Sequence, residues 1–138
     1  FSDDTKRFFK KELKKVNHDL PNIPFQIPLY PRWKALRINI DSCKYMSSKK
    51  VPLYLVFANA DPLGSDIVVM YKYGDDLRQD MLTLQIITLM DGLWLDRNLD
   101  LHLKPYKCLS TGNQAGMLEI VLNSVTVNNI NENYGGVF

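Results

Sequence analysis

The sequence predicts an α+β domain with a roughly five-stranded, mainly antiparallel sheet. Short segments in which apolar and polar residues alternate, bounded by turn residues, are typical of half-buried strands. Two longer segments, residues 3–17 and 77–95, carry apolar residues at helical spacing. One helix precedes three strands and the other separates them from two more. This order favours an α+β fold over a doubly wound parallel sheet.

The size and composition of the chain are those of one ordinary globular domain. It has 138 residues, of which 46% are hydrophobic and 23% charged, and this is enough for a single core. The formal net charge of +2 is too small to indicate nucleic acid binding. No segment approaches the roughly 18 apolar residues of a membrane span. Since the chain begins with Phe1 rather than Met, we expect it to be a fragment of a longer protein.

The first 32 residues predict a basic amphipathic helix followed by a proline-rich connector. Ser2 is a plausible cap for the helix over 3–17. The apolar positions are Phe9, Leu13, Val16 and Leu20, and the basic positions are Lys6, Arg7, Lys10, Lys11, Lys14 and Lys15. The basic face is either an ordinary solvated surface or one attracted to an anionic membrane. Four prolines exclude regular helix from residues 21–32 and predict an extended connector.

Five segments are predicted to be strands. Leu36, Ile38 and Ile40 alternate with polar residues, which indicates a half-buried strand over this segment. Runs of β-forming residues predict strands at 53–58 and 67–73, separated by a loop rich in turn residues. The last two strands are expected at 101–109, which contains Pro105, and at 117–122.

Residues 77–95 carry the strongest helical pattern in the chain. The apolar stripe consists of Leu82, Ile86, Leu89, Met90 and Leu93. A stripe of this width indicates a helix with one face substantially buried. We therefore expect this helix to pack against one face of the sheet.

Cysteine and histidine residues form no recognisable site in the sequence. Cys43 and Cys108 lack the close spacing of a metal site, and we interpret both as reduced core cysteines of a cytosolic protein. His18 and His102 are isolated and are interpreted as structural or surface residues. We expect no metal site in this chain.

A strand, a turn and the start of a helix follow one another in residues 67–81. Lys72 lies near the end of the strand, and Asp80 lies one turn into the helix. A lysine and an acid about 4 Å apart attract each other by roughly 4 kcal/mol of gross Coulomb energy at an effective dielectric near 20. This is enough to orient a lysine toward nucleotide phosphates, as in kinases. Asp75 and Asp76 either cap the helix or share the anchoring of the lysine.

Residues 74–80, Gly-Asp-Asp-Leu-Arg-Gln-Asp, resemble the signature of the phosphoinositide 3-kinase and 4-kinase superfamily. The same core recurs in related large protein kinases, so the motif indicates the superfamily more firmly than the member. The resemblance extends over residues 33–131 and implies the N-terminal lobe of a protein-kinase-like domain at 33–122. Residues 1–32 would lead into this lobe, and residues 123–138 would begin the link to an absent C-terminal lobe.

The resemblance implies an ATP site built from several segments. Residues 46–53 are similar to the family's phosphate-binding loop, in which Ser48 and Lys49 would contact phosphate and Met46 would lie over the adenine. Without the resemblance, this segment would be interpreted as a solvated turn. Lys72 would also contact phosphate, with Asp80 as its anchor.

Residues 105–112 and 116–121 look like the family as well, and the second segment corresponds to its hinge between the lobes. The Glu119 carbonyl and the Val121 N–H would bind adenine through the backbone. The other residues implied in the adenine site are Tyr54, Met70, Tyr106, Leu118 and Ile120. Met70, Leu118 and Ile120 would line an apolar slot, although these three positions fit ordinary core packing equally well. Tyr106 would lie at the back of the slot with Asp80.

Departures from the family pattern bear on the class of kinase. Tyr54 stands where class I members usually carry tryptophan, and Lys107 stands where they usually carry glycine. Residues 61–64 and 108–112 resemble class II members. We therefore expect class II first and class I second.

The resemblance implies that the full-length protein transfers the γ-phosphate of ATP to the 3-hydroxyl of phosphatidylinositol lipids. The family's catalytic, magnesium-binding and activation loops lie in the other lobe. We therefore expect this chain alone to be inactive and the Mg²⁺ ligands to lie outside it. Expected partners are ATP, a phosphoinositide lipid at a membrane surface, and regulatory or accessory protein domains, with no nucleic acid. The expected location is cytoplasmic and peripheral at membranes.

Two alternatives to this function stay open. The first is the same lobe of a phosphatidylinositol 4-kinase or a related large protein kinase. The second is a non-catalytic module that binds a membrane or another protein. Nucleotide binding would separate the second alternative from the kinases.

Overall fold

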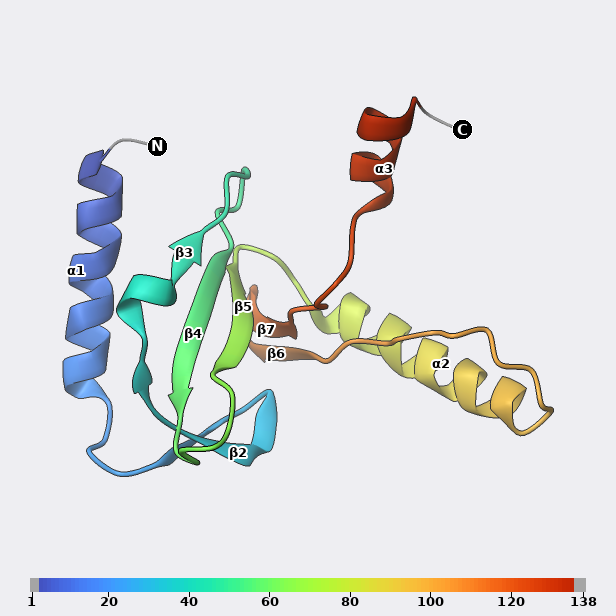
Figure 1. The fold of residues 1–138 in the computed structure, drawn as a ribbon, viewed down its shortest axis with the longest axis horizontal. Coiled ribbons are helices and arrows are strands. Elements are labelled where there is room, and N and C mark those ends of the chain that lie inside the picture. Colours follow the sequence, from blue (N-terminus) through green and yellow to red (C-terminus); the bar gives the residue numbers. More distant parts are fainter. Residues whose placement is uncertain (1–2, 136–138) are drawn as a thin grey trace.

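The computed structural model describes residues 3–135. The elements, in chain order, are α1 (Asp3–Asp19), β1 (Phe25–Ile27), β2 (Tyr30–Ile38), the short 3₁₀ helix η1 (Ile40–Ser42), β3 (Lys44–Tyr45), β4 (Leu53–Asn59), β5 (Ile67–Tyr73), α2 (Arg78–Leu95), β6 (Cys108–Gly112), β7 (Ala115–Glu119) and α3 (Val127–Tyr134). Figure 1 shows α1 on one side of a curled sheet, whereas α2 and α3 extend from the other side. Within the described range, no helix combines the length and apolar composition needed to cross a membrane.

The strands form one sheet in which all pairs are antiparallel. The order is β1-β2-β4-β5-β7-β6, and β3 pairs with β4 at one end. The predicted α+β class and the mainly antiparallel sheet are therefore confirmed. The described sheet has seven strands rather than about five, because the short β1 and β3 join it. The predicted strands at 53–58 and 67–73 correspond to β4 and β5.

The hydrophobic core joins α1 to strands β1, β2, β4 and β5 of the sheet. Ala35, Ile67 and Val69 are completely buried, and Leu13 of α1 packs into the same cluster. The side chain of Asn17 donates to the Ile38 carbonyl and accepts from the Ile38 N–H, at 2.9 and 2.7 Å. These two bonds fix the amphipathic helix against β2. The predicted helix at 3–17 is confirmed, whereas its predicted cap Ser2 lies outside the described residues.

Two predicted strand limits are wrong at the proline-containing segments. The connector 21–32 contains β1 and the start of β2, because β1 pairs with β2 and gives the extended chain a partner. The strand predicted at 101–109 begins only at Cys108. Pro105 lacks a backbone donor for a ladder, and His102 has a φ of 54°, so residues 101–107 stay irregular. β2 also ends before Ile40, and β7 ends before residues 120–122.

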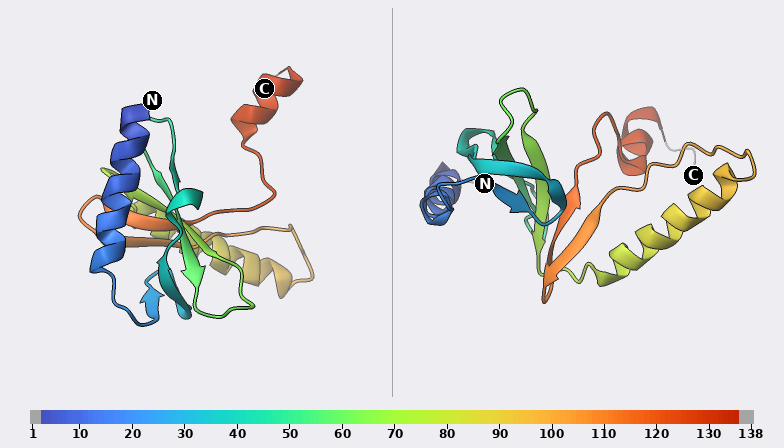
Figure 2. Two further views of the ribbon diagram at one scale, coloured as in Figure 1. Left: turned by 60° about the vertical axis from the view of Figure 1, so that its left-hand side comes forward. Right: turned by 90° about the horizontal axis from the view of Figure 1, so that it is seen from below.

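The helix at 77–95 is confirmed as α2, but its predicted packing is wrong. Its predicted apolar stripe is exposed, with Leu89 at 64% and Leu82 at 58%. α2 contacts the sheet through β6 and then projects away from it (Figure 2). Residues 101–107 run back along the opposite face of α2, so that Met81 and Leu84 share a hollow with Pro105 and Tyr106. The stripe therefore faces away from the part of the chain that covers α2.

A third helix, α3, was not predicted from the sequence. The Thr126 hydroxyl accepts from the Asn129 N–H at its start, and Gly135 takes a left-handed conformation at its end. Both features are ordinary helix caps. The predicted division at residues 33 and 123 stays a prediction, and residues 136–138 of the last segment lie outside the described part.

Candidate nucleotide-binding site

Strand register brings several predicted site residues into one row. Tyr54 pairs with Met70, Met70 pairs with Leu118, and Leu118 pairs with Cys108. Directly paired residues of antiparallel strands point to the same face of the sheet. Lys72, two residues beyond Met70, faces the same side and pairs with Gly116. The predicted apolar slot and the predicted phosphate lysine therefore share one face.

The lysine at the end of β5 is held beside the turn that leads into α2. The Lys72 ammonium lies 3.8 Å from the Asp75 carboxylate, and both side chains are about one-third exposed. The turn itself needs Gly74, whose φ is 88°. A Cβ at Gly116, opposite Lys72, would collide with the Leu109 carbonyl and the Leu77 side chain. These two glycines let the start of α2 approach the lysine closely.

The predicted acids around Lys72 have different partners. The ion pair of Lys72 is formed with Asp75, and not with the predicted anchor Asp80 in the described structure. Asp76 binds the Arg78 guanidinium at 2.6 Å and accepts from the Arg78 N–H. The bonds from Arg78 lower the pKa of Asp76 to about 2. Asp76 therefore orders the turn and leaves Asp75 to the lysine.

Asp80 nevertheless lies within electrostatic reach of the lysine's surroundings. Burial raises the pKa of the Cys108 thiol, the Asp80 carboxylate raises it further, and the Lys72 ammonium lowers it. The acid and the lysine thus act on one side chain from β6. Asp80 also lines, together with Tyr106, a hollow of about 320 Å³.

The loop predicted to bind phosphate is exposed and tied to the Gly74 turn. Met46, Ser48 and Lys49 are exposed. The Val51 N–H donates to the Ser48 carbonyl at 3.1 Å, and the Lys50 ammonium donates to the Gly74 carbonyl at 2.7 Å. The sequence interpretation missed Lys50, because a lysine in a polar turn carries no signal of its distant partner. Lys50 places this loop beside the strand end that carries Lys72.

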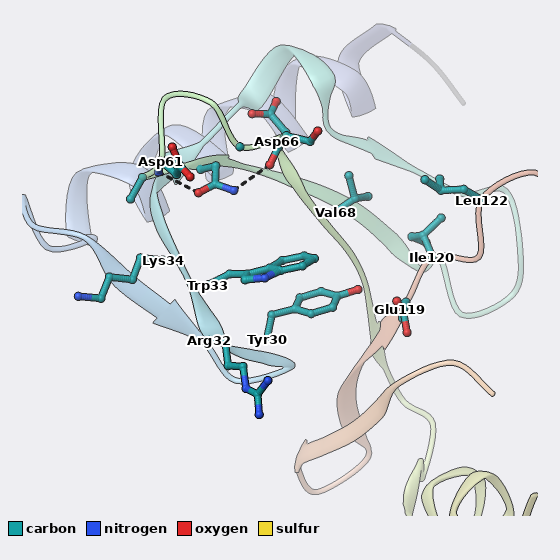
Figure 3. A pocket seen from close by; sticks show the side chains of 14 residues that line it. Tyr30, Arg32, Trp33, Lys34, Asp61, Asp66, Val68, Glu119, Ile120 and Leu122 are labelled. Atoms are coloured by element: carbon teal, nitrogen blue, oxygen red, sulfur yellow. Dashed lines mark hydrogen bonds between the residues drawn. The ribbon is translucent and has the colours of Figure 1, made fainter. Parts of the chain in front are cut away.

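The predicted hinge lies at the rim of a hollow of about 830 Å³ (Figure 3). The predicted residues Glu119 and Ile120 line it, together with Leu122 and Val68. Its opposite wall is formed by Tyr30 and Trp33 of β2 and by the loop between β4 and β5. The exposed Val121 follows directly after β7. The hinge segment therefore has the hollow on the side of β2. It also adjoins the row formed by Tyr54, Met70 and Leu118.

The described part of the chain offers no ready metal centre. Among residues 3–135, no group of three or more His, Cys, Asp or Glu side chains is arranged to hold a metal ion. The two cysteines are free, with Cys43 buried and Cys108 partly buried.

Comparison with known proteins assigns the family. The family model of phosphatidylinositol 3- and 4-kinases matches residues 66–137. The chain belongs to this family. The match begins just before β5, and it therefore includes Lys72, the Gly74 turn, α2 and the predicted hinge. The kinase family resemblance of the sequence is confirmed.

Individual phosphatidylinositol 3-kinases are similar over most of the chain. It is 54% identical to phosphatidylinositol 3-kinase 2 of Dictyostelium discoideum over 112 residues, which are 81% of the chain and 6% of that protein. It is 49% identical to phosphatidylinositol 4-phosphate 3-kinase C2 domain-containing subunit alpha of Pongo abelii over 110 residues, 80% of the chain and 6% of that protein. It is 39% identical to phosphatidylinositol 3-kinase C2 domain-containing subunit gamma of Homo sapiens over 127 residues, 91% of the chain and 8% of that protein. The chain thus spans less than a tenth of these relatives.

Proposed function

We propose that this chain is the ATP-binding N-terminal lobe of a phosphatidylinositol 3-kinase. The full-length protein would transfer the γ-phosphate of ATP to the 3-hydroxyl of a phosphatidylinositol lipid. The observation that carries the proposal is the placement of Lys72 at the end of β5. It lies 3.8 Å from Asp75 and shares a sheet face with Met70 and Leu118.

The chain's own residues would bind and orient the nucleotide. Lys72 would contact phosphate from a rigid strand end, and Ser48 and Lys49 would contact it from the exposed loop. Met70, Leu118 and Ile120, with Tyr54 and Met46, would contact the adenine, while the Glu119 carbonyl and the Val121 N–H would bind its edge. Bound Mg²⁺ would neutralise phosphate charge, and its ligands would come from outside this chain.

The names of the relatives support a 3-kinase over a 4-kinase. Several similar proteins are named phosphatidylinositol 3-kinases, and others are 3-kinases that contain a C2 domain. Class II is favoured by the resemblance of residues 61–64 and 108–112 to that class. The lipid headgroup would be selected by the activation loop outside this chain.

The replacement Lys72→Ala in the full-length protein tests the proposal. Preorganised charge at a transition state typically contributes about 3 kcal/mol, so turnover of phosphatidylinositol with ATP should fall by at least about 100-fold. Folding should be preserved, because the side chain is partly exposed. Lys104→Ala, in the exposed coil beyond α2, is the matched control and should keep normal activity.

Near-normal turnover in the Lys72 variant would remove this lysine from the site. The 138-residue chain alone should phosphorylate no lipid and bind ATP weakly, since only one wall of the cleft is present. ATP-dependent phosphorylation by the pure chain would contradict this division of labour between the two lobes.

We further propose that α1 approaches an anionic membrane. Lys6, Lys10 and Lys15 are paired with the acids Asp3, Asp41 and Glu12. Arg7, Lys11 and Lys14 are exposed and make no ion pair within the described residues. Beside them, Phe8 is 65% exposed. Unpaired cations next to an exposed aromatic ring are suited to anionic lipid headgroups.

Vesicle binding by the chain tests the proposed membrane surface. The double variant Lys11→Glu/Lys14→Glu should lose most binding to phosphatidylserine vesicles, since each cation near such a surface contributes about 1 kcal/mol. The control Arg97→Glu/Lys104→Glu makes the same change of net charge beyond α2. Equal loss in both double variants would assign binding to net charge rather than to α1.

A further inference from the structure

The carboxylate of Glu119 is held by two other segments of the chain at the point where the sheet ends. Glu119 is the last residue of β7, and residues 120–122 continue without strand pairing. Its neighbours across the sheet are Val69 of β5 and the chain that leads into β6. The side chain is therefore anchored where the ladder stops and the predicted hinge begins.

The first anchor is the backbone of Lys107. The Glu119 carboxylate accepts from the Lys107 N–H at 2.8 Å. The Glu119 N–H donates to the Lys107 carbonyl, also at 2.8 Å. Both backbone groups of one residue are thus bound by Glu119, once through its side chain and once through its backbone. These bonds fix the register between the end of β7 and the segment that leads into β6.

The second anchor is Tyr30 of β2, whose hydroxyl lies near enough to the Glu119 carboxylate for the two groups to interact electrostatically. Figure 3 shows Tyr30 reaching from β2 toward Glu119, with its ring beside Trp33. The two rings are stacked, with centroids 4.7 Å apart and planes 14° apart. The Lys107 ammonium lies 4.7 Å from the centroid of the Tyr30 ring. Tyr30 is 6% exposed, so its hydroxyl has little freedom to turn elsewhere.

Tyr30 also stays a donor under all ordinary conditions. Burial, followed by the interaction with the Glu119 carboxylate, raises the pKa of Tyr30 to about 12. The hydroxyl therefore keeps its proton through neutral and mildly alkaline pH. The neutral hydroxyl of Tyr30 can therefore face the Glu119 carboxylate throughout this pH range.

We propose that the Glu119 side chain, held by Tyr30 and the Lys107 backbone, is a positioning device for the adenine-binding backbone. It would fix where the Glu119 carbonyl and the Val121 N–H point, without touching the nucleotide. Tyr30 and Lys107 are then positioning residues for nucleotide selection. This inference rests on the proposed ATP-binding function and assigns to the side chain of Glu119 a role separate from that of its carbonyl.

Steady-state kinetics of the full-length protein test the inference. Glu119→Ala removes the carboxylate that faces both anchors and should raise the KM for ATP by about tenfold, since its charge-assisted hydrogen bond to the Lys107 N–H is lost. Tyr30→Phe keeps the ring and its stacking and should raise this KM by about three- to tenfold. In both variants kcat should stay within about twofold. The preference for ATP over GTP, measured as the ratio of kcat/KM values, should also fall by at least threefold.

Conservative and remote variants separate positioning from folding. Glu119→Gln keeps an oxygen that accepts from the Lys107 N–H and should restore most of the ATP affinity and selectivity. Glu132→Ala, on α3, and Tyr73→Phe, which is 71% exposed, are matched controls and should leave all constants unchanged. Thermal melting checks that Tyr30→Phe is folded. A smaller folded fraction lowers kcat alone and leaves nucleotide preference unchanged.

The outcomes distinguish this inference from the proposed function. If the wild-type protein phosphorylates lipid with ATP but Tyr30→Phe and Glu119→Ala keep its KM and its nucleotide preference, the positioning role is wrong and the proposed function stands. If kcat falls while both of these stay unchanged, the cluster serves stability alone and the inference is overturned. If the wild-type protein does not use ATP, the proposed function is wrong and the inference falls with it.

Discussion

The sheet and the α2 region differ in how far their apolar residues are buried. On β5, Ile67 and Val69 are completely buried by α1 and the neighbouring strands. On α2, Leu89 and Leu82 stay more than half exposed. In the sequence, β5 is a continuous run of β-forming residues, and α2 carries apolar residues at helical spacing. A sequence pattern thus locates the apolar residues of an element, whereas the tertiary structure decides whether the same chain covers them.

The largest expected effect of this difference is on stability. Ile67→Ala in the 138-residue chain should lower the free energy of unfolding by about 2–5 kcal/mol, because it leaves a cavity in a close-packed core. Chemical denaturation monitored by circular dichroism measures this change. A cost below 1 kcal/mol would mean that the sheet is no better packed than α2, and the comparison would fail.

The fold of the sheet could be predicted because its signals are local. β4 and β5 are continuous runs of β-forming residues, and the Gly74 turn and the start of α2 follow from neighbouring residues. β1 and β3 could not be predicted in the same way. They contain three and two residues and exist because β2 and β4 offer edges to pair with. The strand predicted at 101–109 failed where Pro105 interrupts a run of apolar residues.

For the candidate site, the face of each strand residue could be predicted from the sequence, whereas contacts across the turn could not. The row of Tyr54, Met70 and Leu118 agrees with strand register, since a period of two determines which face a side chain takes. The ion pair of Lys72 with Asp75 and the bond from Lys50 to the Gly74 carbonyl depend on distances across the turn. Spacing in the sequence cannot rank several nearby acids or link residues 24 positions apart.

The second prediction tests whether the backbone after β7 binds adenine through the Val121 N–H. In the full-length protein, Val121→Ala should leave ATP affinity within a few-fold. Val121→Pro should weaken it by about 1–3 kcal/mol, because proline deletes the N–H and one buried hydrogen bond is lost. The fold should tolerate this proline, since residue 121 lies outside the strands. Isothermal titration calorimetry measures both affinities.

A folded Val121→Pro variant that binds ATP as tightly as Val121→Ala would show that the hinge assignment is wrong. Circular dichroism of both variants is the necessary control. With this result the adenine site would have to lie away from β7. The difference in packing between the sheet and α2 would then have no connection to nucleotide binding.

The third prediction concerns the exposed face of α2. Leu89→Ala in the 138-residue chain should change the free energy of unfolding by less than about 0.5 kcal/mol, because the side chain is 64% exposed and alanine is a good helix former. Denaturation under the conditions used for Ile67→Ala gives a direct comparison. A cost near that of Ile67→Ala would mean that the stripe is buried in solution.

The smallest expected effect lies at the joint between the two regions, where Asp76 orders the turn from β5 to α2. The bonds from Arg78 lower its pKa to about 2 from an ordinary value of 3.8. A lowered folded-state pKa means that the carboxylate stabilises the fold above about pH 4, and that this contribution disappears as the pH falls toward 2. Asp76→Asn should therefore be less stable than the wild-type chain at pH 6. The difference in stability between the two proteins should close during acidification, as measured by denaturation midpoints.

Arg78→Gln is the matched control for the Asp76 prediction. It keeps the carboxylate and the backbone bond but removes the guanidinium, so it should show most of the same loss of pH dependence. Asp41, whose pKa is lowered by Lys10, is present in all three proteins, so its contribution cancels in the comparison. A gap that stays constant from pH 6 to pH 2 would mean that Asp76 acts through its shape rather than its charge, and that the joint is held by the Gly74 turn alone.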